Sequence, residues 1–228
     1  MTNVYGFNIS FRRNHRAKRM KLRYDAETDS AIITMPARSS ERAAEKFVLK
    51  NIEWLETQRA LSPAIKYLVP GEVIPFRGKE MLIAHDVTDR GQVLITNTKI
   101  IVGGPREGFS VRLENYLKKY CRKIIEPKAK EMAFSINQGF KRIQIRDTKS
   151  RWGSCSSTGT LSFSWRLILA PEVVLDYVVA HEIAHLEEMN HSPAFWSVVD
   201  QLVDNATASR KWIKNEGREL MLIAKMDY

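Results

Sequence analysis

The sequence predicts an α+β protein in which a β-rich N-terminal half precedes a helical half that carries the functional residues. Three observations support this prediction. Polar and apolar residues alternate over much of residues 1–105, as they do in strands. Apolar residues recur at helical spacing from residue 110 onward. A Gly-Gly-Pro run at 103–105 separates the two patterns. We therefore expect two domains, residues 1–105 and 106–228.

The composition is that of an ordinary globular protein, with 44% hydrophobic and 27% charged residues in a chain of 228. A chain of this length buries a core without disulfide bridges. No stretch is long and apolar enough to span a bilayer, so we expect no membrane association. The first residues lack the layout of a secretion signal, which favours a cytoplasmic protein in which Cys121 and Cys155 are free thiols.

The net charge is 36 − 26 = +10, and part of the excess is concentrated at the N-terminus. Residues 1–24 carry seven Lys or Arg and no acidic residue. Arg19, Lys21 and Arg23 alternate with apolar residues, which places all three charges on one face of a strand. A solvated strand face is the simpler interpretation. The charge also admits an anionic partner, a nucleic acid or a nucleotide, bound by the basic N-terminal half.

The N-terminal half is expected to contain one hairpin, one helix and four further strands. Residues 19–36 predict the hairpin, with its loop at 25–29. Residues 39–60 predict the helix, for which Ser39 or Ser40 is the cap. The further strands are predicted at 72–78, 79–86, 92–97 and 99–104.

The C-terminal half begins with a predicted helix over residues 110–137. Pro127 is expected to kink or break this helix, and Gly139 to end it. Strands are predicted at 141–147 and 159–171, and Pro171 then opens a helix that carries a cluster of histidines.

That cluster is "HEIAHLEEMNH" at residues 181–191, which holds three of the five histidines in the chain. His181 and His185 are four residues apart, so both imidazoles lie on one helix face and can bind one metal ion. Glu182 lies roughly 100° around the helix. From there it can act as general base toward a water bound by the metal, which is the arrangement that His-Glu-x-x-His supplies for zinc-dependent hydrolysis.

A third ligand is expected from His191. If the helix stops near residues 189–190, His191 can return to the ion, and Asn190 tolerates the left-handed conformation that ends helices. Ser192 and Pro193 are then predicted to be the cap and the first residue of a new helix.

The metal site can be structural or catalytic. A structural site closes with four protein ligands, and Cys155 is the available fourth. We favour an open catalytic site with three histidines, because a structural site has no need of Glu182. Zinc is the expected ion, although three imidazoles also suit nickel, copper and cobalt.

Two segments resemble a known family. "KSRWGSCSSTGTLSFSWRLILAP" and "DYVVAHEIAHLEEMNHSPAFW" are similar to the YgjP-like group of small zinc metallopeptidases, which is related to the SprT-type and WLM-type proteases. The resemblance covers about residues 145–200. It implies a minimal zincin-like domain of helices packed on a small sheet, with the active-site helix beneath an edge strand. It also implies zinc ligands at His181, His185 and His191 and the general base at Glu182.

Four further residues are candidates for substrate binding. Ser162 and Ser164 lie on the serine-bearing face of the strand expected at the edge. Arg151 is a candidate to stabilise an oxyanion. Tyr177, one turn before His181, either donates its hydroxyl to the site or packs in the core.

These observations predict a zinc-dependent hydrolase, and most directly a peptidase that acts on proteins or peptides. The first alternative is a metal-dependent phosphoanhydride hydrolase, such as a nucleotide pyrophosphohydrolase, because metal ions and arginines also suit phosphoryl chemistry. The second is a nucleic-acid-associated module with a structural zinc.

Overall fold

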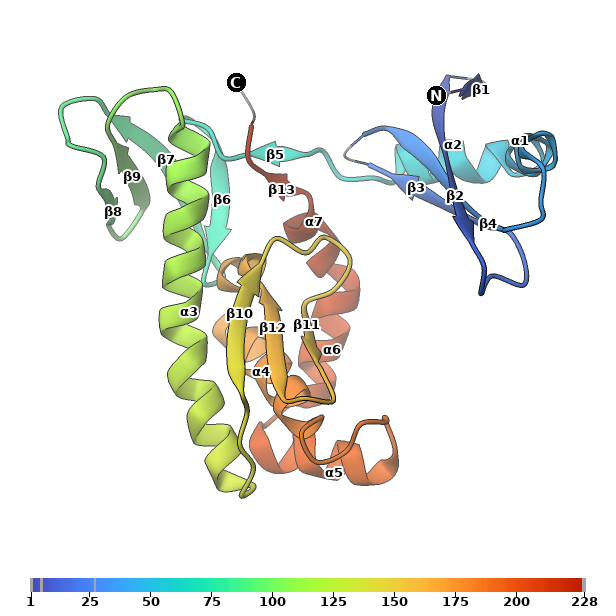
Figure 1. The fold of residues 1–228 in the computed structure, drawn as a ribbon. Helices are drawn as coiled ribbons and strands as arrows, with labels where there is room; N and C mark the ends of the chain where they lie inside the picture. The colour runs from blue at the N-terminus through green and yellow to red at the C-terminus, as the bar shows by residue number, and fades with distance from the viewer. Residues whose placement is uncertain (1, 5, 27, 227–228) are drawn as a thin grey trace. The chain divides into compact units, whose positions relative to one another are not determined.

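The structure is a computed structural model that describes every residue except 1, 5, 27, 227 and 228, and the side chains from residue 6 onward apart from those exceptions. Strands and helices are both abundant, as expected for an α+β protein (Figure 1). The chain forms two compact units, Met1–Ile65 and Lys66–Tyr228. The division therefore lies after Ile65, whereas the sequence pattern suggested a boundary near residue 105.

The first unit is a four-stranded sheet with two helices. Its strands have the order β1-β2-β4-β3, and β2 and β4 run parallel. The predicted hairpin is present, since β3 and β4 pair antiparallel across a turn in which Asp29 has a positive φ of 43°. Its strands and helices are β1 (Thr2–Val4), β2 (Phe7–Asn14), β3 (Lys21–Asp25), β4 (Ser30–Pro36), α1 (Glu41–Leu49) and α2 (Ile52–Ala60).

The helix expected over 39–60 is interrupted at residues 50–51. Ser40 caps α1, and its hydroxyl accepts a hydrogen bond from the Ala43 backbone N–H at 3.2 Å. Asn51 then starts α2, while its side chain donates to the Phe47 carbonyl at 2.7 Å. The break lets both helices bury apolar residues against the sheet, in a core formed by Phe7, Ile9, Ala31, Ile33, Met35, Ala44, Val48 and Leu55.

The basic strand β3 has the alternation that the sequence predicted. Lys21 and Arg23 are exposed, whereas Leu22 and Tyr24 are partly buried against the core of the unit. β3 lies at an edge of the sheet. The charges therefore face solvent.

The second unit begins with β5 (Lys66–Tyr67), which the sequence did not predict. The four strands that follow lie where the sequence placed them: β6 (Val73–Phe76), β7 (Lys79–Asp86), β8 (Val93–Ile95) and β9 (Lys99–Gly103). The last four form a sheet of order β6-β7-β9-β8. Their buried residues, such as Ile83 and Val102, share one core with the helices that follow. This shared core is the physical reason that the unit begins at residue 66 and not near 105.

Helix α3 (Phe109–Ser135) runs without interruption through Pro127. A proline inside a helix removes one backbone hydrogen bond and costs about 3 kcal/mol. Burial of Ile125 and Ala129 on either side of it offsets that cost. The last helical residue is Ser135, Ile136 is the C-cap, and the left-handed residue beyond it is Asn137, with φ of 54°. Of the kink or break expected at Pro127, the break is absent, and the stop expected at Gly139 was wrong.

A three-stranded sheet of order β10-β12-β11 follows, in which β12 is the central strand. β10 (Arg142–Arg146) pairs parallel with β12 (Thr160–Ser164), and β11 (Gly153–Cys155) pairs antiparallel with it. The strand expected over 159–171 ends at Ser164. It continues as a buried 3₁₀ helix, η1 (Trp165–Leu169).

Four helices complete the unit: α4 (Glu172–Ala184), α5 (Pro193–Leu202), α6 (Ala206–Asn215) and α7 (Gly217–Met221). A last strand, β13 (Ile223–Ala224), pairs parallel with β5 (Figure 1). Arg166 of η1 is 1% exposed, and it donates to the Ile223 carbonyl at 2.9 Å and pairs with Asp147. In the described part of the chain, no helix is long and apolar enough to cross a membrane.

Candidate metal centre

Helix α4 carries the first two histidines. It follows Pro171, and most of its residues from Val174 onward are buried, so packing fixes the directions of those side chains. It ends at Ala184, and not near residues 189–190 as the sequence suggested. The end is closed by backbone bonds from Leu186 to Ile183 and from Glu188 to Ala184.

His185 stands at the C-cap of α4, and its imidazole helps to close the turn. Its Nδ1 lies 3.0 Å from the Glu188 carbonyl oxygen. A carbonyl oxygen only accepts, so Nδ1 carries the proton and the lone pair of Nε2 is free for a metal ion. This carbonyl therefore orients the ring, whereas Asp176, on the same helix, pairs with Lys128 at 2.8 Å.

The turn after α4 brings His191 back toward the helix. Asn190 does not adopt the left-handed conformation that was expected of it, because the chain already turns at 185–187. The predicted restart is confirmed. Ser192 caps α5, accepting from the Phe195 backbone N–H at 3.3 Å, and Pro193 is its first residue.

The three imidazoles meet in space. One ring nitrogen from each of His181, His185 and His191 lies within 4.8 Å of the other two. The Nε2 atoms of His181 and His191 are 3.1 Å apart. Zinc binds imidazole nitrogens at about 2.0–2.1 Å with tetrahedral geometry. Nitrogens around such an ion are separated by distances of this size, so the cluster fits a single zinc ion.

The protonation of these rings also suits a metal. Burial, with the neighbouring His185 and His191, lowers the pKa of His181 to about 4. Burial also lowers the pKa of His185. Both rings are therefore neutral near pH 7, which is the form that binds metals.

Glu182 lies in the interior beside this cluster. It is 5% exposed, and burial raises its pKa to about 8, partly opposed by the positive charge of Arg151 and by a hydrogen bond from the Cys155 backbone N–H. Gly153 makes room for it, since a Cβ at this position would lie 2.5 Å from Glu182 Oε1. Only glycine leaves the carboxylate in its place.

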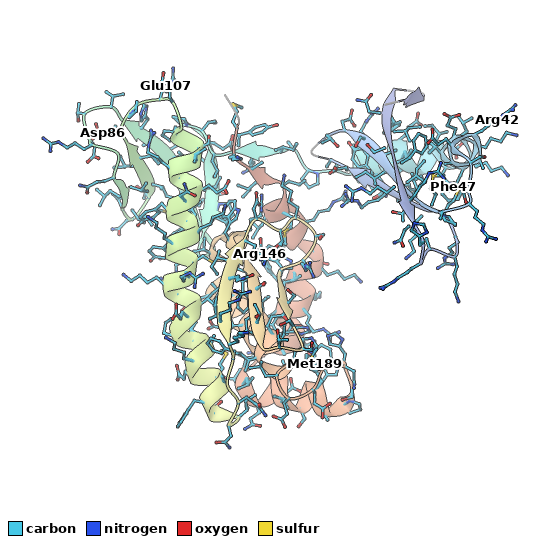
Figure 2. The ribbon with its side chains drawn as sticks, in the orientation of Figure 1. Arg42, Phe47, Asp86, Glu107, Arg146 and Met189 are labelled. Carbon is cyan, nitrogen blue, oxygen red and sulfur yellow. The ribbon has the colours of Figure 1, made fainter. Side chains whose placement is uncertain are left out.

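Two cavities flank the Glu182 carboxylate. One of about 280 Å³ is lined by the three histidines with Cys155 and Met189, and the other of about 200 Å³ by Trp152, Tyr177 and Ile213. Met189, labelled in Figure 2, is 55% exposed at the rim of the first cavity. Glu182 and His181 belong to both, so the carboxylate is accessible from two sides.

Of the four candidates for substrate binding, Arg151 and Tyr177 lie at this site. Arg151 is exposed and near enough for its charge to lower the pKa of Glu182. Tyr177 is 6% exposed, and its hydroxyl lies 3.5 Å from His181 Nδ1. It therefore packs in the core and also touches a candidate ligand.

The two serines have other surroundings. Ser164 is fully buried and donates to the Thr148 carbonyl at 3.0 Å. Ser162 lies in the central strand β12, between Gln144 of β10 and Ser154 of β11. Neither lines the cavities beside Glu182. The expectation that their strand forms the edge was wrong, because β11 covers it on the side of α4.

The edge next to α4 belongs to β11, which contacts that helix. The Ser164 backbone N–H donates to the Trp152 carbonyl at 2.8 Å, and the Ser156 backbone N–H donates to the Thr160 carbonyl at 3.0 Å. These pairs therefore make the ladder hydrogen bonds between β11 and β12. In an antiparallel pair these positions alternate with residues whose backbone groups point away. Gly153 and Cys155 therefore direct their N–H and C=O groups outward.

Two residues of the site were not predicted from the sequence. Gly153 could have been predicted, because an isolated glycine in a strand often marks close approach of another group. Nothing in the sequence indicated Arg210 of α6, since it is distant in sequence from the histidines. Its guanidinium lies 4.2 Å over the Trp196 ring, and its charge contributes to the lowered pKa of His181.

Comparison with known proteins gives one extensive match and two limited ones. Residues 18–216 match the family described as YgjP-like, metallopeptidase domain. Two crystal structures of metallopeptidase zymogens are similar over part of the chain. Abylysin of Pyrococcus abyssi is 20% identical with a TM-score of 0.37, covering 42% of this chain and 97% of its own. Jannalysin of Methanocaldococcus jannaschii is 23% identical with a TM-score of 0.34, covering 40% and 91%.

No curated protein matches the sequence. The family match, in contrast, spans most of the chain and includes residues of both compact units, the histidine cluster and the buried Glu182. The chain belongs to the YgjP-like metallopeptidase family, and it is a metal-dependent hydrolase.

Proposed function

We propose that this protein is a zinc-dependent peptidase in which His181, His185 and His191 hold the ion and Glu182 is the general base. The observation that carries the proposal is the convergence of three imidazole nitrogens within 4.8 Å beside a buried carboxylate. Zinc, when bound, supplies Lewis acidity and makes a nucleophile available at neutral pH.

Glu182 is suited to move a proton in this reaction. Burial raises its pKa to about 8, so this carboxylate accepts a proton more readily than an exposed glutamate does. A general base is most effective when its pKa is near the working pH. Its carboxylate takes the proton of the attacking water and delivers it to the leaving amine.

β11 is the candidate for binding the substrate backbone, in place of the serine-bearing strand β12. The outward N–H and C=O groups of Gly153 and the C=O of Cys155 offer ladder bonds to an extended peptide. That peptide would lie along the cavities that flank Glu182. Arg151 is a candidate for stabilising negative charge on the reacting carbonyl oxygen.

A structural zinc site is less consistent with this arrangement. Cys155, the candidate fourth ligand, lines the same cavity. Among the described residues, however, its Sγ does not belong to the set of potential ligand atoms that lie within 4.8 Å of one another. Burial and the charge of Glu182 raise the pKa of its thiol to about 11. The three-histidine set leaves room for substrate.

Hydrolysis of a phosphoanhydride and an anionic partner for the basic N-terminal unit stay predictions of the sequence. The family match points to protein or peptide substrates and gives no support to nucleic acid or nucleotide partners. No described feature near Glu182 favours phosphate over a peptide.

The experiment is a zinc measurement combined with two assays of the full chain. Wild type and Glu182→Gln are compared on a panel of denatured proteins and on nucleoside triphosphates. We expect one zinc ion per chain in both, and peptide-bond cleavage in wild type that falls ~10²–10⁴-fold in the variant. Cleavage of triphosphates alone would overturn the peptidase proposal. Unfolding on chelation, without any turnover that depends on Glu182, would indicate a structural zinc.

A further inference from the structure

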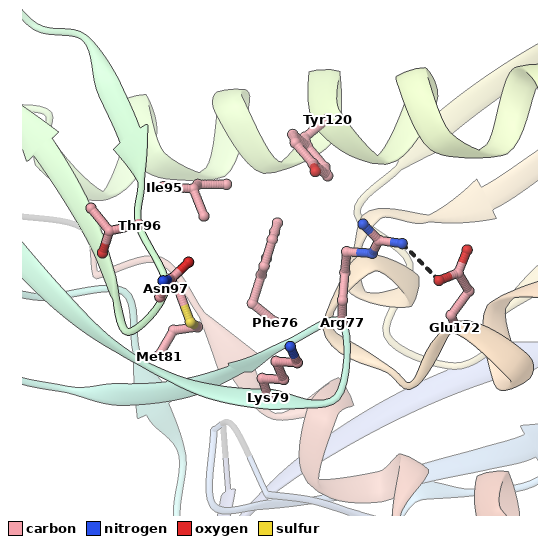
Figure 3. Close-up of a pocket in the computed structure, with 9 residues that line it drawn as sticks. All are labelled: Phe76, Arg77, Lys79, Met81, Ile95, Thr96, Asn97, Tyr120 and Glu172. Atoms are coloured by element: carbon pink, nitrogen blue, oxygen red, sulfur yellow. Dashed lines mark hydrogen bonds and ion pairs between the residues drawn. The ribbon is translucent and has the colours of Figure 1, made fainter.

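A separate cavity lies at the opposite end of α4 from the histidines. It has a volume of about 440 Å³, which is within the range of small-molecule sites. The β6–β7 hairpin, the β8–β9 turn, α3 and the first turn of α4 enclose it (Figure 3). Neither the family match nor the proposed peptidase reaction assigns it a role.

One side of the cavity is positively charged. Arg77 and Lys79 line it, and in the described part of the chain Lys79 forms no ion pair. Arg77 pairs with Glu172 at 2.7 Å, as the dashed line in Figure 3 shows. Glu172 is also paired with Lys128 at 3.0 Å. Lys128 is shared between Glu172 and Asp176, from which it lies 2.8 Å away. Arg77, Lys79 and Lys128 therefore face two carboxylates, and one positive charge remains in excess.

The backbone of Arg77 is held in an unfavourable conformation. Four described non-glycine residues have a positive φ, and three of them are Asn or Asp, which tolerate it. Arg77 is the fourth, with φ of 51°. The turn is fixed by bonds from the Arg77 and Gly78 backbone N–H groups to η1. Asparagine tolerates this conformation better than arginine does, so the turn by itself does not favour an arginine here.

The remaining walls include two aromatic rings. The rings of Phe76 and Tyr120 lie 5.2 Å apart at 60° to each other, and the Arg77 guanidinium lies beside the Tyr120 hydroxyl. Asn97 lies across the cavity from Arg77 (Figure 3), and in the described part of the chain its carboxamide has no hydrogen-bond partner. It is free to bind a polar edge.

We propose that this cavity binds a small planar organic anion, with its carboxylate or phosphate group at Arg77 and Lys79 and its ring against Phe76 and Tyr120. An anion at Arg77 competes with Glu172 for the guanidinium. The carboxamide of Asn97 binds a polar group on the far edge of the ring. The site is distinct from the metal centre and does not depend on the proposed peptidase activity.

The test is calorimetric titration of the full chain with two probes, adenosine monophosphate and indole-3-carboxylate, which share a flat ring and an anionic group. Inorganic phosphate and adenosine supply each half alone. We expect saturable binding of at least one probe, at least ~10-fold tighter than that of either half.

Variants locate the binding. Arg77→Asn keeps the left-handed turn. This variant and Lys79→Ala should each weaken binding about 10-fold, because each loses about one charge-assisted hydrogen bond. Glu172→Gln should tighten binding several-fold because it releases Arg77. Lys99→Ala, on the same sheet outside the cavity, is the matched control and should leave binding unchanged.

Three results would overturn the proposal. The first is no saturable binding of either probe at millimolar concentration. The second is equal weakening in Lys79→Ala and Lys99→Ala. The third is loss of binding in His185→Ala, which would place the anion at the metal centre. Zinc content and peptide cleavage are measured separately, so failure here leaves the proposed peptidase activity intact.

Discussion

The two ends of α4 use carboxylates in opposite ways. Glu172, in the first turn, has a side chain that is 48% exposed and paired with Lys128 and Arg77, which lower its pKa. Glu182, in the last turn, is 5% exposed, and burial raises its pKa to about 8. The same chemical group therefore holds elements together at one end and is kept ready to accept a proton at the other. What differs is burial and the distance to the nearest cation.

The largest expected effect comes from removing a candidate ligand. His185→Ala should lower zinc affinity by more than about 100-fold, because a direct ligand contributes more than the orienting partners whose loss costs ~10–100-fold. Competition with a chromophoric chelator measures the affinity. His15→Ala, an exposed histidine of the first unit, is the control and should bind zinc like wild type. Unchanged zinc affinity in His185→Ala would contradict the assignment of the C-terminal end of α4 as the metal site.

A smaller effect is expected from displacing Glu182 without changing its chemistry. In Gly153→Ala the new Cβ would lie 2.5 Å from Glu182 Oε1 and 2.6 Å from its Cγ, so the carboxylate must move. A misplacement of this size costs about 100-fold in rate, while zinc stays bound. Steady-state kcat and zinc content are the measurements. Gly139→Ala, where a Cβ meets nothing within 4 Å, is the matched control. Full activity in Gly153→Ala would contradict the assignment of Glu182 as general base.

The smallest effect is expected in the first turn of α4, where Glu172 forms ion pairs. Glu172→Gln should reduce the free energy of unfolding by no more than about 1 kcal/mol at neutral pH, because exposed ion pairs contribute little. The folded-state pKa of Glu172 is lowered, so its contribution is present above the unfolded pKa and is lost as pH falls through the folded pKa. Denaturant unfolding of both proteins at pH about 7 and about 3 checks the sign. A difference that grows toward acid pH would contradict the pairing.

Local spacing was sufficient to predict much of the metal centre. His181 and His185 share a face because they are four residues apart, and Ser192 and Pro193 mark the restart that returns His191. Each of these signals lies within a few neighbouring residues. The convergence of the three side chains therefore follows from sequence, while their role as ligands stays a proposal.

The sheet order could not be predicted in the same way. β12 was expected at the edge because the resemblance to zincin-like domains implies an edge strand beside the active-site helix, yet β11 covers it. β11 has only three residues, too few for a periodic pattern. Its position depends on pairing and on contact with α4, which no local window contains. For the same reason the sequence offered no sign of Arg210, or of the break between the units at residue 65.

The pairing of β5 with β13 has a consequence for how the chain is made. Lys66 and Tyr67 pair with Ile223 and Ala224, and the Leu68 backbone N–H donates to the Ala224 carbonyl at 2.9 Å. The second unit is thus closed by its first and last segments. During synthesis the first unit is complete after about one quarter of the chain and can fold while translation continues. The second unit cannot complete its β5–β13 pairing until Ile223 and Ala224 have left the ribosome.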